Sequence, residues 1–488
     1  MEGSSVPFLV GRLVRKQQLY LDGQWTPGRS EIEVRSPFDQ AVVGSYSVAD
    51  TQQVDRAIAA AHRSLLTGLA PHRRAEILDA TRVIVERRAE EFARSISEES
   101  GKPIRAARVE VGRALQTLRL AADEARRMEG ESVAVDGFAG GAGLIALTLP
   151  EPLGVVAAIT PFNFPMNLVL HKVAPAIAAG CPVVLKPSER TPLTAGRLVE
   201  AFDEAGLPAG WLNLVTGDPG EIVGMLQGDD RIAVISFTGS SRVGWQIKAG
   251  SPRKHHVLEL GSNAAMVVDE DADLDLAVTA AVSGGFAYSG QACISVQRLF
   301  VHEAVFDSFL TRFAAAVSEL RTGDPLAEPT DVGPLISQDA TKRVARWLRD
   351  AVADGAHVVT GADLDHGILK PTVITGVADT SPLRCEEVFG PVVVVVPVKD
   401  AEAGLRGAND SRFGLNTAIF TNNLARAVGF ARRAEAGSVL VNVSPSFRAD
   451  QMPYGGVKDS GQGREGVRHA VAGLTRQKLV IVNAGSGE

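Results

Sequence analysis

The sequence predicts an α/β fold that combines a doubly wound parallel sheet, a second α/β region and a β-ribbon, on the basis of three patterns. Strand and helix signals alternate from about residue 154 to 260. They alternate again from about 262 to 450. Before these regions, residues 131–154 combine Gly clusters with alternating apolar residues. Regular alternation of strands and helices is typical of a parallel sheet covered by helices.

The stretch from about 50 to 130 is predicted to be helical. Its segments "VDRAIAAAHRSLL" and "RRAEILDATRVIVERRAEEFARSISEES" place apolar residues three and four positions apart, with charges between them. We interpret the charged runs as solvated helix faces. The segment 131–154 breaks this period, and its alternation predicts a β-ribbon or hairpin.

The first α/β region is predicted from buried-strand patterns that alternate with helical ones. The predicted strands are 154–160, 182–186, 211–216, 232–239 and 255–260. The predicted helices are 166–180, 191–206, one near 219–227 and one from about 240. Ligands of such sheets bind beyond the carboxyl ends of the strands, so residues just after these strands are candidate site residues.

The second α/β region has its strands in "RLFVHE", "VVVVVPV", "TAIFT" and "GSVLVNV", and a helix leads into Cys293. The C-terminal "TRQKLVIVNA" (475–484) is predicted to be an isolated strand with no obvious neighbour. Such a strand needs a partner, and pairing with another subunit is one solution.

Length and composition exclude several classes of protein. A chain of 488 residues is too long for one hydrophobic core, so two or three domains are expected. The net charge of −7 comes without a long basic run, which argues against nucleic acid as a partner. The most apolar run, 391–398, is far shorter than the ~20 residues that span a membrane, and the N-terminus lacks the apolar core of a signal peptide.

The three cysteines raise the question of reactivity. No Cys/His cluster is present, so neither a disulfide framework nor a metal site is expected, and a cytoplasmic location is favoured. Cys181 and Cys385 are interpreted as packing residues. Cys293 stands in the Gly-rich stretch "SGGFAYSGQACISVQRL" and is either a small buried apolar side chain or a nucleophile.

Two polar residues follow strands of the first region. Glu259 ends an apolar run, where desolvation would raise its pKa toward the range of a general base. The alternative is a carboxylate that accepts backbone hydrogen bonds. Asn163 lies between prolines, where it would donate a hydrogen bond to a developing oxyanion or form a structural Asx-turn.

Three further motifs suit either a nucleotide or an ordinary structural role. Ser240 opens a helix after a strand, as a phosphate site or as a plain N-cap. Lys186 and Glu189 would bind ribose hydroxyls or form a surface ion pair. Glu387 and Phe389 precede a Gly-Pro turn that would aim one acid into a cleft or leave it solvated.

Together these motifs resemble the NAD(P)-dependent aldehyde dehydrogenase superfamily, and the resemblance extends from about residue 20 to 482. The family-like motifs occur in the family's order: PFNFP (161–165), KPSE (186–189), FTGS with a following Gly (237–244), LELG (258–261), GQxC (290–293), EEVFGP (386–391) and PYGGVKDSGQGREG (453–466).

The resemblance implies a Rossmann-type cofactor domain, an α/β catalytic domain and a β-ribbon oligomerisation element. The implied boundaries are 1–130 with 151–258 for the NAD-binding domain, 259–466 for the catalytic domain, and 131–150 with 467–488 for oligomerisation. The implied assembly is a homodimer or homotetramer.

The resemblance also implies roles for site residues. Cys293 would be the nucleophile, Glu259 the base that activates water, and Asn163 with the Cys293 amide the oxyanion hole. The implied cofactor-binding residues are Thr160, Pro161, Phe162, Lys186, Ser188, Glu189, Phe237, Gly239, Ser240, Val243, Leu260, Gly261, Glu387 and Phe389. NAD is favoured over NADP because a carboxylate at Glu189 would repel a 2′-phosphate.

Within the family, "SNAA" after LELG, "ISVQR" after the cysteine and "SFRADQMPYGGVK" resemble the lactaldehyde dehydrogenase-like branch. The implied substrate-binding residues are Asn167, Leu168, His171, Ala292, Ile294 and Arg448. Arg448 would pair with an anionic substrate tail or tie down its own loop through Asp450. The expected substrate is a small polar aldehyde, 2-hydroxylated or with an anionic tail, such as lactaldehyde or a phospho-, phosphono- or sulfo-aldehyde.

The sequence is less consistent with three other functions. Transfer of the acyl group to coenzyme A ranks second, because an activating carboxylate at Glu259 favours hydrolysis. A catalytically silent NAD-binding protein is disfavoured by the intact set of Cys293, Glu259 and Asn163. A thiol hydrolase lacks a positioned histidine, since only His171 lies near any of these motifs.

Overall fold

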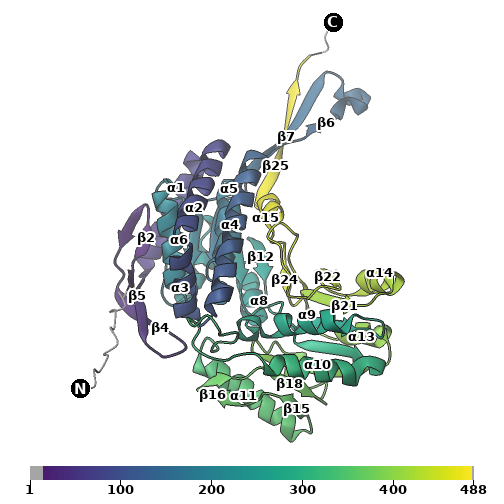
Figure 1. Ribbon diagram of the computed structural model, residues 1–488. Coiled ribbons are helices and arrows are strands. Elements are labelled where there is room, and N and C mark those ends of the chain that lie inside the picture. The colour runs from purple at the N-terminus through teal and green to yellow at the C-terminus, as the bar shows by residue number, and fades with distance from the viewer. Residues whose placement is uncertain (1–14, 486–488) are drawn as a thin grey trace, which may run out of the picture.

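The computed structural model describes residues 15–485, and Figure 1 shows two helix-covered sheets from which a narrow β arm stands out. The predicted α/β class is confirmed, and so is the helical stretch after residue 50. That stretch forms α1 (Thr51–Thr67), α2 (Pro71–Arg87), α3 (Ala89–Ser100) and α4 (Ile104–Arg126). Asp50 begins α1 with a capping box, because its side chain accepts from Gln53 N–H while the Gln53 side chain accepts from Asp50 N–H.

The first sheet has eight strands, and its five central strands are parallel, as predicted. In sheet order the strands are β24 (Gly461–Gln462), β12 (His255–Glu259), β11 (Ile232–Thr238), β8 (Val155–Ile159), β9 (Val183–Lys186), β10 (Leu212–Leu214), β2 (Leu19–Leu21) and β3 (Gln24–Thr26). The two edges are antiparallel, since β24 pairs with β12 and β2 with β10. These short edge strands were not predicted, because two or three residues carry no readable period.

Four predicted helices cross over between the strands of this sheet. They are α5 (Asn167–Ala179), α6 (Pro192–Glu204), α7 (Pro219–Gly228) and α8 (Ser241–Gly250). One face of the sheet packs with α2, α4, α5 and α6 into a large core rich in alanine, valine and leucine. The opposite face packs against α1, α7 and α8. Both faces are therefore covered, as buried parallel strands require.

The second sheet has seven strands, all parallel except β15. Its order is β15 (His357–Thr360), β18 (Thr372–Thr375), β19 (Val392–Val398), β14 (Arg298–His302), β13 (Ala265–Val268), β21 (Asn416–Phe420) and β22 (Ser438–Val441). Its helices are α9 (Leu274–Phe286), α10 (Phe306–Ser318), α11 (Gln338–Ala353), α12 (Pro382–Cys385), α13 (Ala401–Asn409) and α14 (Leu424–Arg433). The predicted strands of this region are confirmed.

Smaller elements complete these two lobes. A three-stranded sheet of β1 (Arg15–Gln17), β5 (Val42–Val48) and β4 (Ser30–Arg35) lies near the N-terminus. Short hairpin pairs are β16 (Leu364–Asp365) with β17 (Ile368–Leu369), and β20 (Phe413–Gly414) with β23 (Val457–Lys458).

The arm is a three-stranded antiparallel sheet of β6 (Ser132–Val133), β7 (Leu144–Pro152) and β25 (Thr475–Asn483), and α15 (Val467–Gly473) leads into it (Figure 1). The predicted ribbon at 131–154 is confirmed. The expectation that the C-terminal strand has no neighbour in its own chain is wrong, because β25 pairs with β7 along its whole length, from Thr475 opposite Pro152 to Asn483 opposite Leu144.

None of the helices within residues 15–485 is long and apolar enough to cross a membrane.

Candidate active site

Four parallel strands of the first sheet end together at one edge. The pairing registers show this directly, because Ile159 lies opposite Lys186 and Thr238 lies opposite Glu259. Asn163 follows β8 by a few residues. The predicted catalytic and cofactor residues of the first region therefore share one edge, where ligands of doubly wound sheets bind.

The loop that carries Cys293 has an unusual backbone. After α9, three successive residues, Tyr288, Ser289 and Gly290, have φ values of 48°, 56° and 70°. A Cβ on Gly290 would lie 2.2 Å from the Gly390 carbonyl oxygen, so this position needs glycine both for its φ and for close packing. Ser289 Oγ donates to Gly333 O at 2.7 Å. The cysteine loop is thus held at two places, by the Ser289 bond to Gly333 and by the packing of Gly290 against the turn at Gly390.

Cys293 is half-buried, and its Sγ lies 3.1 Å from the Tyr454 hydroxyl oxygen. Burial raises the pKa of the thiol to about 12, and the nearby Glu387 and Glu259 carboxyls add to this. The Tyr454 hydrogen bond and the Arg448 charge act in the opposite direction. The side chain is therefore held in a polar, charged surrounding rather than in a purely apolar core.

Asn163 connects the loop after β8 to the cysteine loop. Its Nδ2 donates to Gln291 O at 3.0 Å, two residues before Cys293. The residue is buried, and its Oδ1 has no hydrogen-bond partner among residues 15–485. An amide nitrogen carries two hydrogens, so one N–H remains available for a substrate oxygen.

Glu259, at the end of β12, is a buried carboxyl whose two oxygens find no hydrogen-bond partner in the described part of the chain. Burial and the neighbouring Glu465 raise its pKa well above the usual range. The charges of Arg448, Lys172 and Arg464 partly offset this rise. A buried, unpaired carboxyl is costly, so its presence points to chemistry rather than to packing.

Glu465, a neighbour of Glu259, forms ion pairs with Lys172 and Arg448. It accepts from Lys172 Nζ at 3.0 Å and from Arg448 Nη2 at 2.8 Å, and all three side chains are buried. The two cations hold the pKa of Glu465 below its usual range. Its backbone pairs with Tyr454, and the same segment adds β24 to the first sheet, with Gly461 opposite Glu259.

Arg448 does not pair with Asp450, so that structural alternative is wrong. Asp450 instead accepts from Arg113 at 2.7 Å and lies 2.9 Å from His171 Nε2. The Arg448 guanidinium lies 3.8 Å from the centre of the Tyr454 ring, and its side chain is only 6% exposed. Its Nε has no hydrogen-bond partner among the described residues, so the guanidinium keeps donor capacity beyond Glu465.

The other candidate substrate residues surround these groups. Asn167 is buried, and its Nδ2 donates to Asp450 at 3.3 Å. His171 is buried, and burial and the Arg448 charge lower its pKa, so it is neutral near pH 7. Leu168 and Ile294 are buried, and Ala292 is half-buried.

The residues beyond β9 suit a ribose. Lys186 is buried with its Nζ 3.3 Å from the Glu189 carboxylate, whose side chain is 43% exposed. Burial lowers the pKa of Lys186. Glu189 lines a pocket of about 310 Å³ that also contains Arg35 and Arg190.

The start of α8 suits a pyrophosphate. Ser240 occupies the N-cap position, and its side chain caps no N–H of the helix as far as residues 15–485 are concerned. A Cβ on Gly244 would lie 2.3 Å from Leu260 Cδ2, so glycine lets α8 pack close to the end of β12. Free N–H groups at a helix start bind anions, so these residues fit the diphosphate of a dinucleotide.

Glu387 and Phe389 lie on the facing loop, before β19. Glu387 accepts from Ser262 N–H at 2.9 Å, and burial raises its pKa to about 7. Phe389 has φ 49°, and its ring meets the Phe162 ring edge-on at 5.8 Å. The loop of Glu387 and Phe389 therefore meets the loop of Phe162, which follows β8, at the carboxyl ends of the strands.

The remaining candidate cofactor residues line the same edge. Thr160, Ser188, Phe237 and Leu260 are buried, Pro161, Gly239 and Val243 are half-buried, and Gly261 lies against the Glu387 carboxylate.

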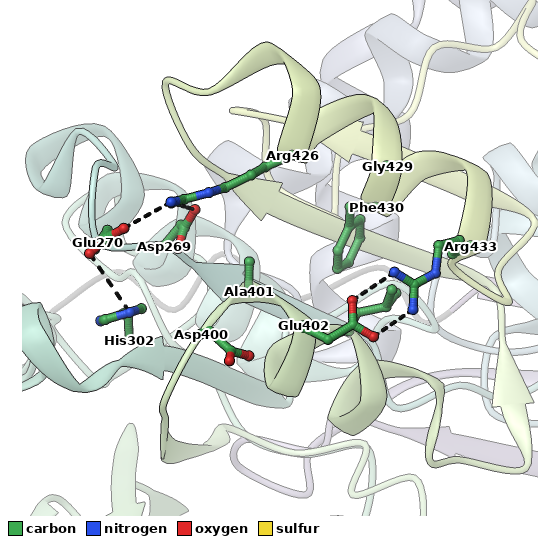
Figure 2. A pocket seen from close by; sticks show the side chains of 11 residues that line it. Asp269, Glu270, His302, Asp400, Ala401, Glu402, Arg426, Gly429, Phe430 and Arg433 are labelled. Carbon is green, nitrogen blue, oxygen red and sulfur yellow. Dashed lines mark hydrogen bonds and ion pairs between the residues drawn. The ribbon is translucent and has the colours of Figure 1, made fainter.

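A different hollow, of about 340 Å³, lies beyond the carboxyl ends of β13, β14 and β19 and contains none of these residues (Figure 2). Most of its charged groups are paired: Arg426 contacts Asp269 at 2.7 Å and Glu270 at 2.9 Å, and Arg433 pairs with Glu402. Asp400, which also lines the hollow, caps α13 by accepting from Ala403 N–H at 2.7 Å.

Two other findings concern the cysteines and metals. Cys181 is buried in the core as expected, but Cys385 is exposed, so its interpretation as a packing residue is wrong. A search of residues 15–485 finds no group of three or more His, Cys, Asp or Glu side chains that could hold a metal ion.

Sequence reasoning missed Tyr454, Glu465, Lys172 and Arg113 as parts of this site. Tyr454 and Glu465 lie in the family-like motif 453–466, and Lys172 is a lone charge in the otherwise apolar helical segment "MNLVLHKVAPAIAAG". A buried charge requires a partner, and that partner is Glu465.

A doubly wound sheet with a helix start that fits a diphosphate, facing a loop with a cysteine, is typical of a dinucleotide-dependent oxidoreductase. Comparison with known proteins makes this specific: the profile of the aldehyde dehydrogenase family matches residues 25–480. The chain belongs to this family and is an NAD(P)-dependent aldehyde dehydrogenase, which confirms the resemblance.

Several relatives match over nearly their whole length. A 3-sulfolactaldehyde dehydrogenase of Priestia aryabhattai is 40% identical over 470 residues, 96% of this chain and 98% of that protein. A lactaldehyde dehydrogenase of Methanococcus maripaludis is 37% identical over 472 residues, 95% of this chain and 100% of that protein. The crystal structure of aldehyde dehydrogenase 21 from Physcomitrella patens, in complex with the product succinate, superposes with a TM-score of 0.94 at 38% identity and covers 97% of this chain and 99% of that one.

Proposed function

We propose that this protein oxidises a small aldehyde with an anionic or hydroxylated tail to its carboxylic acid, with NAD, through a thioester on Cys293. The proposal rests on three groups that lie together. The Cys293 thiol contacts the Tyr454 hydroxyl, the buried Glu259 carboxyl has no hydrogen-bond partner in the described residues, and the buried Arg448 guanidinium has an unused N–H donor. The relatives named sulfolactaldehyde and lactaldehyde dehydrogenases support the substrate class.

Cys293 attacks the aldehyde carbon as the thiolate. The new S–C bond converts the carbonyl into an oxyanion, which the second N–H of Asn163 Nδ2 and the Cys293 backbone N–H stabilise. One such donor contributes roughly 3 kcal/mol in comparable sites. The existing bond from Asn163 to Gln291 O holds the amide in place for this task.

The residues at the strand edge hold the dinucleotide. Ser240 and the start of α8 bind its diphosphate, Lys186 and Glu189 the adenosine ribose, and Glu387 the nicotinamide ribose. When bound, NAD supplies the hydride acceptor for the oxidation step. Glu189 favours NAD, whereas Arg190 in the same pocket would allow some use of NADP; Arg35 there is already paired with Glu33.

Glu259 completes the cycle as general base. It takes a proton from water, which attacks the thioester and releases the acid and the Cys293 thiolate. Its two oxygens are uncommitted, so one can accept from water. This feature favours hydrolysis over transfer to coenzyme A.

Arg448 selects the substrate tail. Glu465 accepts a hydrogen bond from Nη2 of the guanidinium, whereas Nε has no partner among the described residues, so the remaining N–H donors suit a carboxylate, phosphate or sulfonate.

We therefore predict that Arg448→Ala lowers kcat/KM for an anionic aldehyde at least tenfold and for a plain alkanal much less.

The test follows NADH at 340 nm with lactaldehyde, succinate semialdehyde, sulfolactaldehyde, phosphonoacetaldehyde and an alkanal, with NAD or NADP and with or without coenzyme A. Arg426→Ala, in the remote hollow of Figure 2, is the control variant. Equal loss for anionic and neutral aldehydes in Arg448→Ala would refute the substrate assignment. A requirement for coenzyme A would replace hydrolysis by acyl transfer.

A further inference from the structure

The hydroxyl of Tyr454 is the group that contacts the Cys293 sulfur most directly. The two atoms are 3.1 Å apart, and either can donate while the sulfur is a thiol. Once the sulfur is a thiolate it can only accept, so the tyrosine must be the donor. A hydrogen bond to the charged form favours that form.

Tyr454 is rigidly placed for this contact. Its side chain is 1% exposed and packs with Ile294 and Leu415, with Cys293 at the border of this apolar cluster. Its backbone pairs in both directions with Glu465, through bonds of 3.0 and 2.6 Å. The donor is thus in position before any substrate arrives, which removes the cost of reorganisation.

The charges around the sulfur oppose one another. Arg448, above the Tyr454 ring, favours the thiolate, whereas Glu259 and Glu387 disfavour it. Glu465 pairs with both Lys172 and Arg448, so one carboxylate offsets only part of their combined positive charge. Burial, the Cys293 sulfur and the Glu259 carboxyl raise the pKa of Tyr454 well above its usual value, against the opposing Arg448 charge, so the phenol keeps its proton at neutral pH.

We infer that Tyr454 is a further catalytic residue, whose hydroxyl donates a hydrogen bond to the Cys293 thiolate and so stabilises the thiolate relative to the thiol. The S–H proton passes to solvent, the sulfur lone pair forms the S–C bond, and the carbonyl π electrons move to oxygen. Tyr454 keeps its own proton throughout. The inference rests on the proposed role of Cys293, but its test does not require turnover.

The experiment compares Tyr454→Phe with its parent, both carrying Cys385→Ser to remove the exposed thiol. Iodoacetamide labelling of Cys293 is followed by peptide mass spectrometry from pH 6.5 to 9.5. Loss of a hydrogen bond to a charged group should raise the thiol pKa by about one to two units. Because a more basic thiolate is also a better nucleophile, labelling at pH 8 should slow by roughly three- to tenfold.

The control variant is Tyr20→Phe, which removes another largely buried hydroxyl, bonded to Asp203 and distant from the site. It should label Cys293 at the parent's rate. Thermal melting shows whether either variant is destabilised as a whole. An unchanged labelling profile in a folded Tyr454→Phe protein would overturn the inference, even if NADH formation fell.

The labelling result also separates this inference from the proposed function. Slower labelling in Tyr454→Phe, with no aldehyde oxidised by the parent, would support the hydrogen bond and refute the proposed function. Unchanged labelling with an active parent would do the reverse.

Discussion

At the scale of single residues, the proposed mechanism makes the protonation state of Glu259 set the rate at which the thioester is hydrolysed. Glu259→Gln keeps the shape of the side chain but removes the base, so the thioester should form and then hydrolyse slowly. The expected result is a first-turnover burst of NADH that persists while steady-state turnover falls about 10²- to 10⁴-fold. Stopped-flow absorbance at 340 nm measures both phases.

The same residue predicts a pH dependence. Glu259 works only when deprotonated, and its pKa is raised. Turnover by the parent should therefore rise with pH through that raised pKa and fall as the carboxyl protonates below it, whereas Glu259→Gln should lose this limb. Glu402→Gln, whose side chain pairs with Arg433 in the hollow of Figure 2, is the control. Loss of the burst together with the steady state would instead place Glu259 before thioester formation.

Sequence reasoning at this scale selected candidate residues that carry a local signal, and the structure brings these candidates together. Cys293, Glu259 and Asn163 stand out because each is a polar residue at a strand end or in a glycine-rich loop. The partner of Arg448 was missed because Glu465 lies 17 residues further on, in a segment that turns back to the first sheet. Asp450 is nearer in sequence, but Arg113 and His171 already hold it.

At the scale of elements, a buried ion pair sets the position of α5. Lys102, just before α4, pairs with Glu110, and its ammonium lies 3.8 Å from the centre of the Phe164 ring. Glu110 Oε1 accepts from the N–H groups of Met166 and Asn167, at 3.0 and 3.1 Å. The pair thereby anchors the start of α5, directly after the loop of Asn163.

We predict that Lys102→Met destabilises the protein by roughly 3–5 kcal/mol, because it leaves the Glu110 charge buried without its cation. Arg108→Met, on an exposed turn of α4, should cost at most ~1 kcal/mol. Urea unfolding of both variants provides the comparison. Equal small losses would show that the backbone N–H groups of Met166 and Asn167 alone hold Glu110 in place.

The elements themselves were largely predictable. The periods of β8 to β12 and α5 to α8 are local properties of the chain, so the sequence displays them. The pairing of β25 with β7 was not predictable, because it joins segments more than 300 residues apart and strand pairing leaves no local trace. The pairing of β24 with β12 was not predictable for the same reason, because the two strands are far apart in the sequence.

At the scale of the whole molecule, the arm exposes apolar side chains that one chain cannot cover. Leu479 and Ile481 are 53% and 52% exposed on one face, and Ile145 and Leu149 are 55% and 47% exposed on the other. β25 is also an edge strand of its sheet, so the backbone groups on its outer side pair with no other strand among residues 15–485. These features support the proposed homodimer or homotetramer.

We therefore expect Leu479→Glu with Ile481→Glu to reduce the assembly toward monomers, as measured by light scattering with size-exclusion chromatography. Leu424→Glu, at a 78% exposed leucine on α14, tests whether a new charge alone has this effect. A parent protein that is already monomeric would contradict the proposal.

The return of the C-terminal segment to the first lobe has a consequence for synthesis on the ribosome. β24 completes the edge of a sheet whose other strands lie before residue 260, and β25 covers β7. A nascent chain therefore exposes the open edges of β12 and β7 until its last residues emerge. During that interval the open edges are sites at which another chain can pair and aggregate, and a chain terminated before residue 461 never closes them.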